Sequence, residues 1–260
     1  MEYLKFFGIG MFTGIITTLL GIGGGVLIIP ILLYITNTEV KIATAISAIQ
    51  VFFASSFGTL FNYLQKTINF RYAVIFGLSS GFTYFFGSYF TQYIPGIIIK
   101  IIYLCVVVLA IILFFIKKSN KGRNLDNEIA STLIPAKKDY FKIIPIALVA
   151  GFVFGILGVG GGFLYVPLLV ISFDLPLKIA IGTSLMIVLF NAIPGIVGKL
   201  MVIRFDIFIG VAVALGVIVG SRIGTYINKK VKPQIIRIIF ISLLVAIIIR
   251  VAVDLYQNFS

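Results

Sequence analysis

Several long stretches of this chain contain no charged side chain and are built mainly from apolar residues. They run from Phe6 to Ile35, Ile42 to Gln65, Tyr72 to Ile99, Ile101 to Ile116, Ile143 to Phe173 and Ile179 to Gly198. A helix of about 20 residues crosses the hydrocarbon core of a bilayer, which is roughly 30 Å thick. Because lipid offers no hydrogen-bond partner to an open backbone, segments of this kind fold as helices. The sequence therefore predicts an all-α polytopic membrane protein.

The composition agrees with a membrane location and excludes several classes of function. Of the 260 residues, 60% are hydrophobic and 11% are charged, which leaves too little polar surface for a soluble globular protein. The net charge of +13 comes mostly from residues at the ends of apolar stretches, and no basic stripe with interleaved aromatic residues indicates nucleic-acid binding. The chain holds no histidine and one cysteine, so we expect no metal site and no cofactor.

A glycine-rich motif interrupts the first apolar stretch of each half of the chain. The sequence reads Gly-Ile-Gly-Gly-Gly from Gly21 and Gly-Val-Gly-Gly-Gly from Gly158, and a proline follows each motif at Pro30 or Pro167. In a membrane transporter, breaks at corresponding points of two halves are a sequence-level indication of the substrate site.

The motif is part of a longer internal repeat with an offset of 137 residues (158 − 21). At this offset, and without a gap, Gly14 aligns with Gly151, Lys41-Ile42-Ala43 with Lys178-Ile179-Ala180, Ser47 with Ser184 and Gly87 with Gly224. Apolar composition alone does not account for aligned triple glycines, prolines and Lys-Ile-Ala. The pattern predicts a duplication.

The duplication predicts two homologous four-helix repeats and about eight transmembrane helices. The first repeat covers residues 1–116, the second covers residues 143–260, and residues 117–142 form a linker rich in Lys and Arg that we expect on the cytoplasmic side. In each repeat a glycine-broken first helix precedes three unbroken spans. The segments are Leu4 to Ile35, Ile42 to Leu64, Tyr72 to Phe90 and Ile97 to Ile116, then Ile143 to Phe173, Leu177 to Leu200, Ile207 to Ile227 and Ile235 to Val253.

The relative orientation of the two repeats depends on the broken helix. If it crosses the membrane once, each repeat makes four crossings and the repeats are parallel. If its second piece turns back, each repeat makes three net crossings and the repeats are inverted. Inversion places Lys229, Lys230, Lys232 and Arg237 on the same side as the linker, so the positive-inside rule favours it.

The glycine motifs are candidate anion sites. Glycine accepts backbone angles that other residues resist, so each motif ends one helix and starts another with uncovered N–H groups and a partial positive charge. The candidate substrate-binding residues are Gly21, Gly23, Gly24 and Gly25 with Gly158, Gly160, Gly161 and Gly162, and Pro30 and Pro167 have structural roles. The alternative is close helix packing. It explains Gly14, Gly81, Gly87, Gly216, Gly220 and Gly224 well, but three consecutive glycines poorly.

Polar residues on the helix after each motif are further candidates for binding the substrate. Ser47 and Gln50 in the first half lie on one helical face, as do Ser184 and Asn191 in the second half. Their side chains can donate hydrogen bonds to the oxygens of a ligand. The alternative is ordinary hydrogen bonding between helices, which is common in membranes.

Few charged residues are expected inside the membrane. The eight acidic residues lie in loops or near helix ends, which gives no support to coupling through a buried carboxylate. Arg222 falls near the end of a span, where it either reaches the interface or attracts an anion. Arg250 and Lys199 are interpreted as helix-end anchors.

The paired motifs, the prolines and the Lys-Ile-Ala segment resemble the TauE/SafE family of sulfite and organosulfonate exporters. The resemblance extends from Phe6 to about Val253 and rests on Gly21, Gly23, Gly24, Gly25 and Pro30 with Gly158, Gly160, Gly161, Gly162 and Pro167. It implies a multi-pass permease of the inner cell membrane that exports sulfite, sulfoacetate, thiosulfate or a related anion.

The residues and the resemblance both predict a transporter of a small oxyanion, with that anion and the lipid bilayer as its partners. An enzyme would need nucleophiles, bases or metal ligands inside the bundle, and the spans lack them. Two alternatives stay open: a membrane scaffold or assembly protein, and a transporter of a different small anion.

Overall fold

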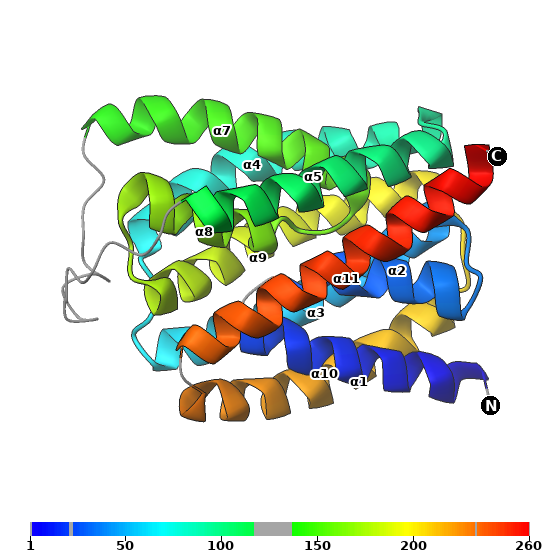
Figure 1. The fold of residues 1–260 in the computed structure, drawn as a ribbon, viewed down its shortest axis with the longest axis horizontal. Helices are drawn as coiled ribbons and strands as arrows, with labels where there is room; N and C mark the ends of the chain where they lie inside the picture. The colour runs from blue at the N-terminus through cyan, green and yellow to red at the C-terminus, as the bar shows by residue number, and fades with distance from the viewer. Residues whose placement is uncertain (1, 21–22, 117–136, 232, 260) are drawn as a thin grey trace.

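The computed structural model describes residues 2–20, 23–116, 137–231 and 233–259. Within these ranges the chain forms ten α-helices, one short 3-10 helix and no strand, so the all-α prediction is confirmed (Figure 1). The helices are α1 (Glu2–Leu20), α2 (Gly25–Ile35), α3 (Val40–Leu64), α4 (Phe70–Phe90), η1 (Thr91–Tyr93), α5 (Gly96–Ile116), α7 (Lys137–Leu157), α8 (Gly162–Phe173), α9 (Leu177–Val202), α10 (Ile207–Lys230) and α11 (Pro233–Phe259). Gly21 and most of the predicted linker lie outside the described residues, and α7 begins inside that linker at Lys137.

Five helices of the described part are long and apolar enough to cross a bilayer. Their apolar spans are Tyr3–Leu20, Val40–Leu64, Gly96–Leu113, Leu177–Val202 and Ile207–Ile227. Helix α4 has 21 residues but is not among them, and its middle carries Ser79, Ser80 and Thr83. The chain is thus a helical protein with several membrane-spanning helices, and the total of eight stays a prediction.

The side chains are sorted as a bilayer requires. Large apolar side chains point outward, such as Phe82 and Val149, each 68% exposed. Polar side chains such as Gln50 and Asn191 are completely buried. Because a soluble protein shows the reverse distribution, this surface fits lipid on the outside and a polar interior.

The helices run in an order that brings the two glycine breaks together (Figure 1). Helix α1 runs from the end of the molecule where the N-terminus lies toward the middle, and α2 turns back to that end. Helices α3, α4 and α5 then run along the molecule in alternating directions. Helix α7 starts from the opposite end, α8 turns back to it, and α9, α10 and α11 alternate in the same way. The two broken segments therefore approach the middle from opposite ends.

Helix pairing follows the 137-residue offset. Helix α1 packs along α10, and α4 packs along α7. At this offset α1 corresponds to α7 and α4 corresponds to α10. The pair α1–α10 therefore corresponds to the pair α7–α4. Helices α3 and α9, which also correspond, pack against each other in the centre.

Glycines allow the close approach of the outer helix pairs. A Cβ at Gly216 or Gly220 of α10 would overlap the carbonyl groups of Phe7 or Met11 in α1. Gly14, Gly87 and Gly224 have similar backbone contacts, and Gly81 lies close to Phe190. For these glycines the close-packing interpretation is confirmed, because no larger side chain fits between the helices.

We expect Gly220→Ala to lower the free energy of unfolding by about 1–3 kcal/mol, because the added methyl group forces α1 and α10 apart. Thermal unfolding of the detergent-solubilised protein measures the change. Gly8→Ala on α1 is the matched control, because a Cβ there meets no atom within 4 Å. Equal melting temperatures for the two variants would contradict the proposed packing role.

Candidate functional site

Two glycine turns form the centre of the candidate site. Gly24 precedes α2 with a φ of 83°, and Gly161 precedes α8, also with a φ of 83°. Backbone angles in this region favour glycine over any other residue. No side chain caps either helix. Each motif thus ends one helix and starts another, as the sequence predicts.

The two turns contact each other in the interior of the protein. A Cβ at Gly25 would overlap Cα of Val159 in the second turn, and a Cβ at Gly23 would lie 3.7 Å from the backbone N of Gly162. The hydroxyl of Ser47 donates a hydrogen bond of 2.8 Å to the carbonyl of Gly158. The starts of α2 and α8 therefore lie side by side.

Unpartnered polar groups surround the first turn. A Cβ at Gly24 would overlap the amide nitrogen of Gln50 and lie 2.7 Å from Oγ1 of Thr17. Both side chains are completely buried. Within the described residues, neither amide atom of Gln50 nor the Thr17 hydroxyl has a hydrogen-bond partner. An unsatisfied buried polar group costs about 1–3 kcal/mol, so these groups are candidates for bonds to a ligand.

The other predicted polar residues bond to protein atoms. Ser184 donates to the carbonyl of Ile181 at 2.8 Å, within its own helix. Asn191 accepts a 2.6 Å bond from Ser80 and donates a 3.2 Å bond to the Tyr165 hydroxyl. Ser47 and Gln50 thus lie at the glycine turns, whereas Asn191 joins α9 to α4 and α8.

The prolines lie inside the short helices that follow the turns. Pro30 in α2 has no N–H, so the carbonyl of Val26 lacks its usual helical donor. The hydroxyl of Tyr103 in α5 donates to that carbonyl instead. Pro167 occupies the corresponding place in α8 and is also buried. This hydrogen bond from Tyr103 joins the start of α2 to α5.

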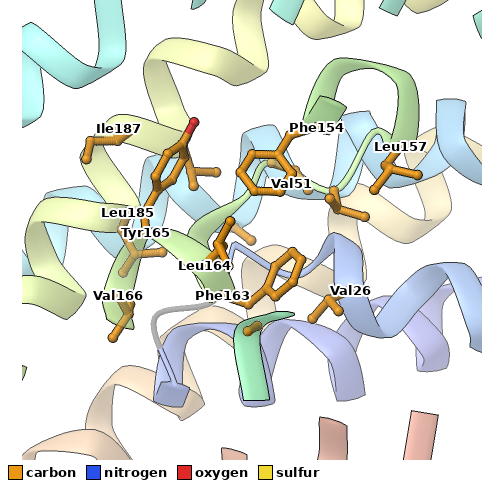
Figure 2. Close-up of a cluster of buried hydrophobic side chains, with 14 of the residues drawn as sticks. Val26, Val51, Phe154, Leu157, Phe163, Leu164, Tyr165, Val166, Leu185 and Ile187 are labelled. Atoms are coloured by element: carbon orange, nitrogen blue, oxygen red, sulfur yellow. The ribbon is translucent and has the colours of Figure 1, made fainter. Parts of the chain in front are cut away.

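Mostly apolar side chains surround the second turn, and its Gly160 N–H already donates a 3.1 Å hydrogen bond to the Tyr84 hydroxyl. A Cβ at Gly161 would overlap the ring of Phe154, whose centroid lies 5.8 Å from that of Phe163 and 5.4 Å from that of Tyr165. Figure 2 shows these three rings among the buried apolar side chains around the start of α8. At the 137-residue offset, Phe154 replaces Thr17 and Ile187 replaces Gln50. The two turns are therefore chemically unequal. The interpretation of both motifs as equivalent anion sites did not predict this difference.

A pocket lies along α2, beside the turns. Its cavity volume is about 10 Å³, roughly the space of one water molecule, and it is lined by Ile29, Pro30, Leu33, Tyr34, Val40, Thr44, Ile99, Lys100, Tyr103, Leu157 and Val251. Lys100 forms a 2.6 Å salt bridge with Asp254, and the Arg250 guanidinium lies 4.4 Å from the centre of the Tyr34 ring. Arg250 is therefore a packing partner of α2 in addition to lying near the end of α11.

The interpretation of Lys199 as a helix-end anchor is wrong. Its side chain is 1% exposed, and its ammonium donates to Oγ1 of Thr44 at 3.1 Å, Oγ1 of Thr91 at 2.6 Å and the carbonyl of Ile156 at 2.8 Å. A lysine near the end of an apolar helix usually reaches the membrane interface. The signal against this was Gly198, whose backbone packs against α4 and so buries this end of α9. Arg222 on α10 is exposed, as expected for a side chain at the interface.

The sequence model of the sulfite exporter TauE/SafE family matches residues 6–251, which include both glycine turns and the helices around them. The chain belongs to this family. Two of its relatives align with more than nine tenths of this TauE/SafE protein. The probable membrane transporter protein YunE of Bacillus subtilis is 26% identical over 95% of this chain and 96% of its own length. The probable membrane transporter protein MJ0441 of Methanocaldococcus jannaschii is 28% identical over 91% of this chain and 90% of its own length. No solved structure matches the chain significantly.

Membership makes this TauE/SafE protein a multi-pass membrane protein of a transporter family, as the resemblance implied. Its interior adds three residues that motif analysis did not single out. Thr17 lies at the first turn, Phe154 covers the second, and Lys199 lies between the second turn and the pocket. Lys199 depends on contacts between distant segments, which the motif alone could not show. Thr17 and Phe154 lie close to their motifs in the sequence, and their position could have indicated them.

Proposed function

We propose that this TauE/SafE protein is a permease of the inner cell membrane that exports a small sulfur-containing oxyanion such as sulfite, sulfoacetate or thiosulfate. The observation that carries the proposal is the buried and unpartnered Gln50 side chain beside Gly24 at the start of α2. The family description supports the class of substrate.

The chemistry of the first turn suits an anion with several oxygen atoms. The start of α2 presents the backbone N–H groups of Gly25 and Val26 and a partial positive charge, whereas the N–H of Leu27 already donates to the carbonyl of Gly24. The Gln50 amide and the Thr17 hydroxyl add neutral donors in a site without water contact. Together these donors replace the hydration shell of the anion without a strong charge that would hold it too tightly to be released.

The repeat arrangement supports movement of the anion across the membrane. In this proposal the chain has two homologous, inverted repeats, each with a broken first helix and three crossings. The directions of the helices and the corresponding helix pairs support it (Figure 1). In inverted-repeat transporters the substrate binds near the midplane, and one bundle rocks against the other. In this proposal the glycine turns, where the two broken helices meet, take that place.

Transport by the purified protein in proteoliposomes tests the proposed function. We expect release of labelled sulfite, thiosulfate or sulfoacetate above protein-free liposomes, at a rate that increases with an interior-negative potential, because one negative charge gains about 2.3 kcal/mol per 100 mV. Chloride tests the alternative of a different small anion. The proposal is contradicted if none of the three sulfur anions is transported. If chloride is not transported either, the result favours a scaffold or assembly protein.

A further inference from the structure

Lys199 is a basic side chain in the protein interior, and none of its hydrogen-bond partners among the described residues is acidic. Its three donors bond to two threonine hydroxyls and one backbone carbonyl, all uncharged. Among the described residues the salt bridge found is Lys100 with Asp254, which lies at the pocket and does not include Lys199. Burying a charge without an opposite charge is unfavourable, and intramembrane cations usually mark a path for ions.

The position of Lys199 links the pocket to the glycine turns. Thr44, which accepts one of its bonds, also lines the pocket. Ile156, which accepts another, lies two residues before Gly158. Lys199 thus bonds both to a residue of the pocket wall and to the segment that precedes the second turn.

Polar side chains of α3 continue this line toward the start of α2. Thr44, Ser47 and Gln50 follow at intervals of three residues on one face of α3. Thr44 contacts Lys199, Ser47 bonds to Gly158, and Gln50 lies beside Gly24. The row leads from the pocket wall to the proposed binding site.

A purely structural role does not require the charge. The Lys199 side chain, from α9, lies at the C-terminal end of α7, where a positive charge interacts favourably with the helix dipole. However, the hydroxyl of Ser88 already donates to the carbonyl of Gly155, and that of Thr91 to the carbonyl of Ile156. In the first half the corresponding residue is the neutral Asn62, which bonds to Gly58 of its own helix. A neutral donor thus suffices in the corresponding position.

We propose that Lys199 is the specificity-determining cation of the transport path, and that the pocket along α2 widens during transport to become the vestibule through which the anion reaches it. The inference rests on the proposed function. The passing anion forms an ion pair with Lys199 and takes the place of a threonine hydroxyl. The charge then selects anions over neutral solutes before they reach the uncharged donors of the first turn.

Charge-neutral replacement tests the role of Lys199 in transport. In proteoliposomes that carry labelled sulfoacetate, we expect Lys199→Gln to lower kcat/KM about tenfold or more, because the ion pair is lost. Lys199→Arg should keep most of the flux. Lys178→Gln, which removes an exposed lysine of the same helix, is the matched control and should not change it. A glutamine bonds to the same neutral acceptors, so full flux in Lys199→Gln would overturn the proposal.

Cysteine labelling tests the path independently of transport. In a Cys105→Ser background, which removes the single native cysteine, Lys199→Cys should react with the anionic, membrane-impermeant reagent sulfonatoethyl methanethiosulfonate. Ala147→Cys, at a completely buried position of α7, should not react. If Lys199→Cys folds, as judged by size-exclusion chromatography, and stays as unreactive as Ala147→Cys, the vestibule is wrong even if the wild-type protein transports anions. If Lys199→Cys reacts but no flux is found, the proposed function fails and the path stands.

Discussion

Replacing Gln50 by leucine is expected to stabilise the protein and abolish transport. Leucine fills nearly the same volume without a polar group, so the cost of the unsatisfied amide, about 1–3 kcal/mol, is removed. The anion loses the side chain that replaces its water, so flux should fall about tenfold or more. Thermal unfolding in detergent and flux in proteoliposomes measure the two effects on one preparation.

Asn191→Leu is the matched control for this prediction. Asn191 is also a buried amide, but it bonds to Ser80 and Tyr165, so its replacement leaves partners unsatisfied and should lower the melting temperature. Opposite shifts for the two variants distinguish an amide kept for a ligand from one kept for the fold. A destabilised Gln50→Leu protein with normal flux would show that Gln50 serves the fold.

Gly25→Ala is expected to damage both the fold and transport. The added methyl group would overlap Cα of Val159, which is backbone and cannot rotate away. The two turns must therefore separate, at a cost of about 2–3 kcal/mol. Because the first N–H groups of α2 move with the turn, flux should fall about tenfold or more. Melting temperature and flux report the two losses.

Gly8→Ala is the control here as well, because it adds the same methyl group to an open position on α1. Alanine also favours the helix over glycine by about 0.5–1 kcal/mol, so this variant should be at least as stable as the wild type. Normal transport by Gly25→Ala would mean that the contact between the two turns has no part in binding.

Features that depend on local sequence could be predicted well. Apolar stretches of membrane length predict helices because backbone groups in lipid have no other partner, and the structure has them. The helix breaks at Gly24 and Gly161 follow from the backbone angles that glycine alone adopts easily. Spaced glycines such as Gly220 indicated close packing for the same local reason.

Features that depend on contacts between distant segments could not be predicted. Gln50 and Asn191 carry the same chemical group on corresponding helices. Only the fold shows that Asn191 has partners and that Gln50 has none in the described part of the chain. Lys199 lies near a helix end in the sequence, but its ammonium bonds to η1 and α7 in the interior. The inequality of the two turns, in contrast, is visible in the sequence, because Phe154 and Ile187 stand where the 137-residue offset places Thr17 and Gln50.

A structure determined with bound selenite tests the central claim most directly, because selenium replaces sulfur in the same oxyanion and its anomalous scattering locates it. We expect a selenium peak at the start of α2, with the anion oxygens within hydrogen-bond distance of the Gln50 amide and of the first backbone N–H groups of that helix. A selenium peak elsewhere in the protein, with the Gln50 side chain still unpartnered, would contradict the account.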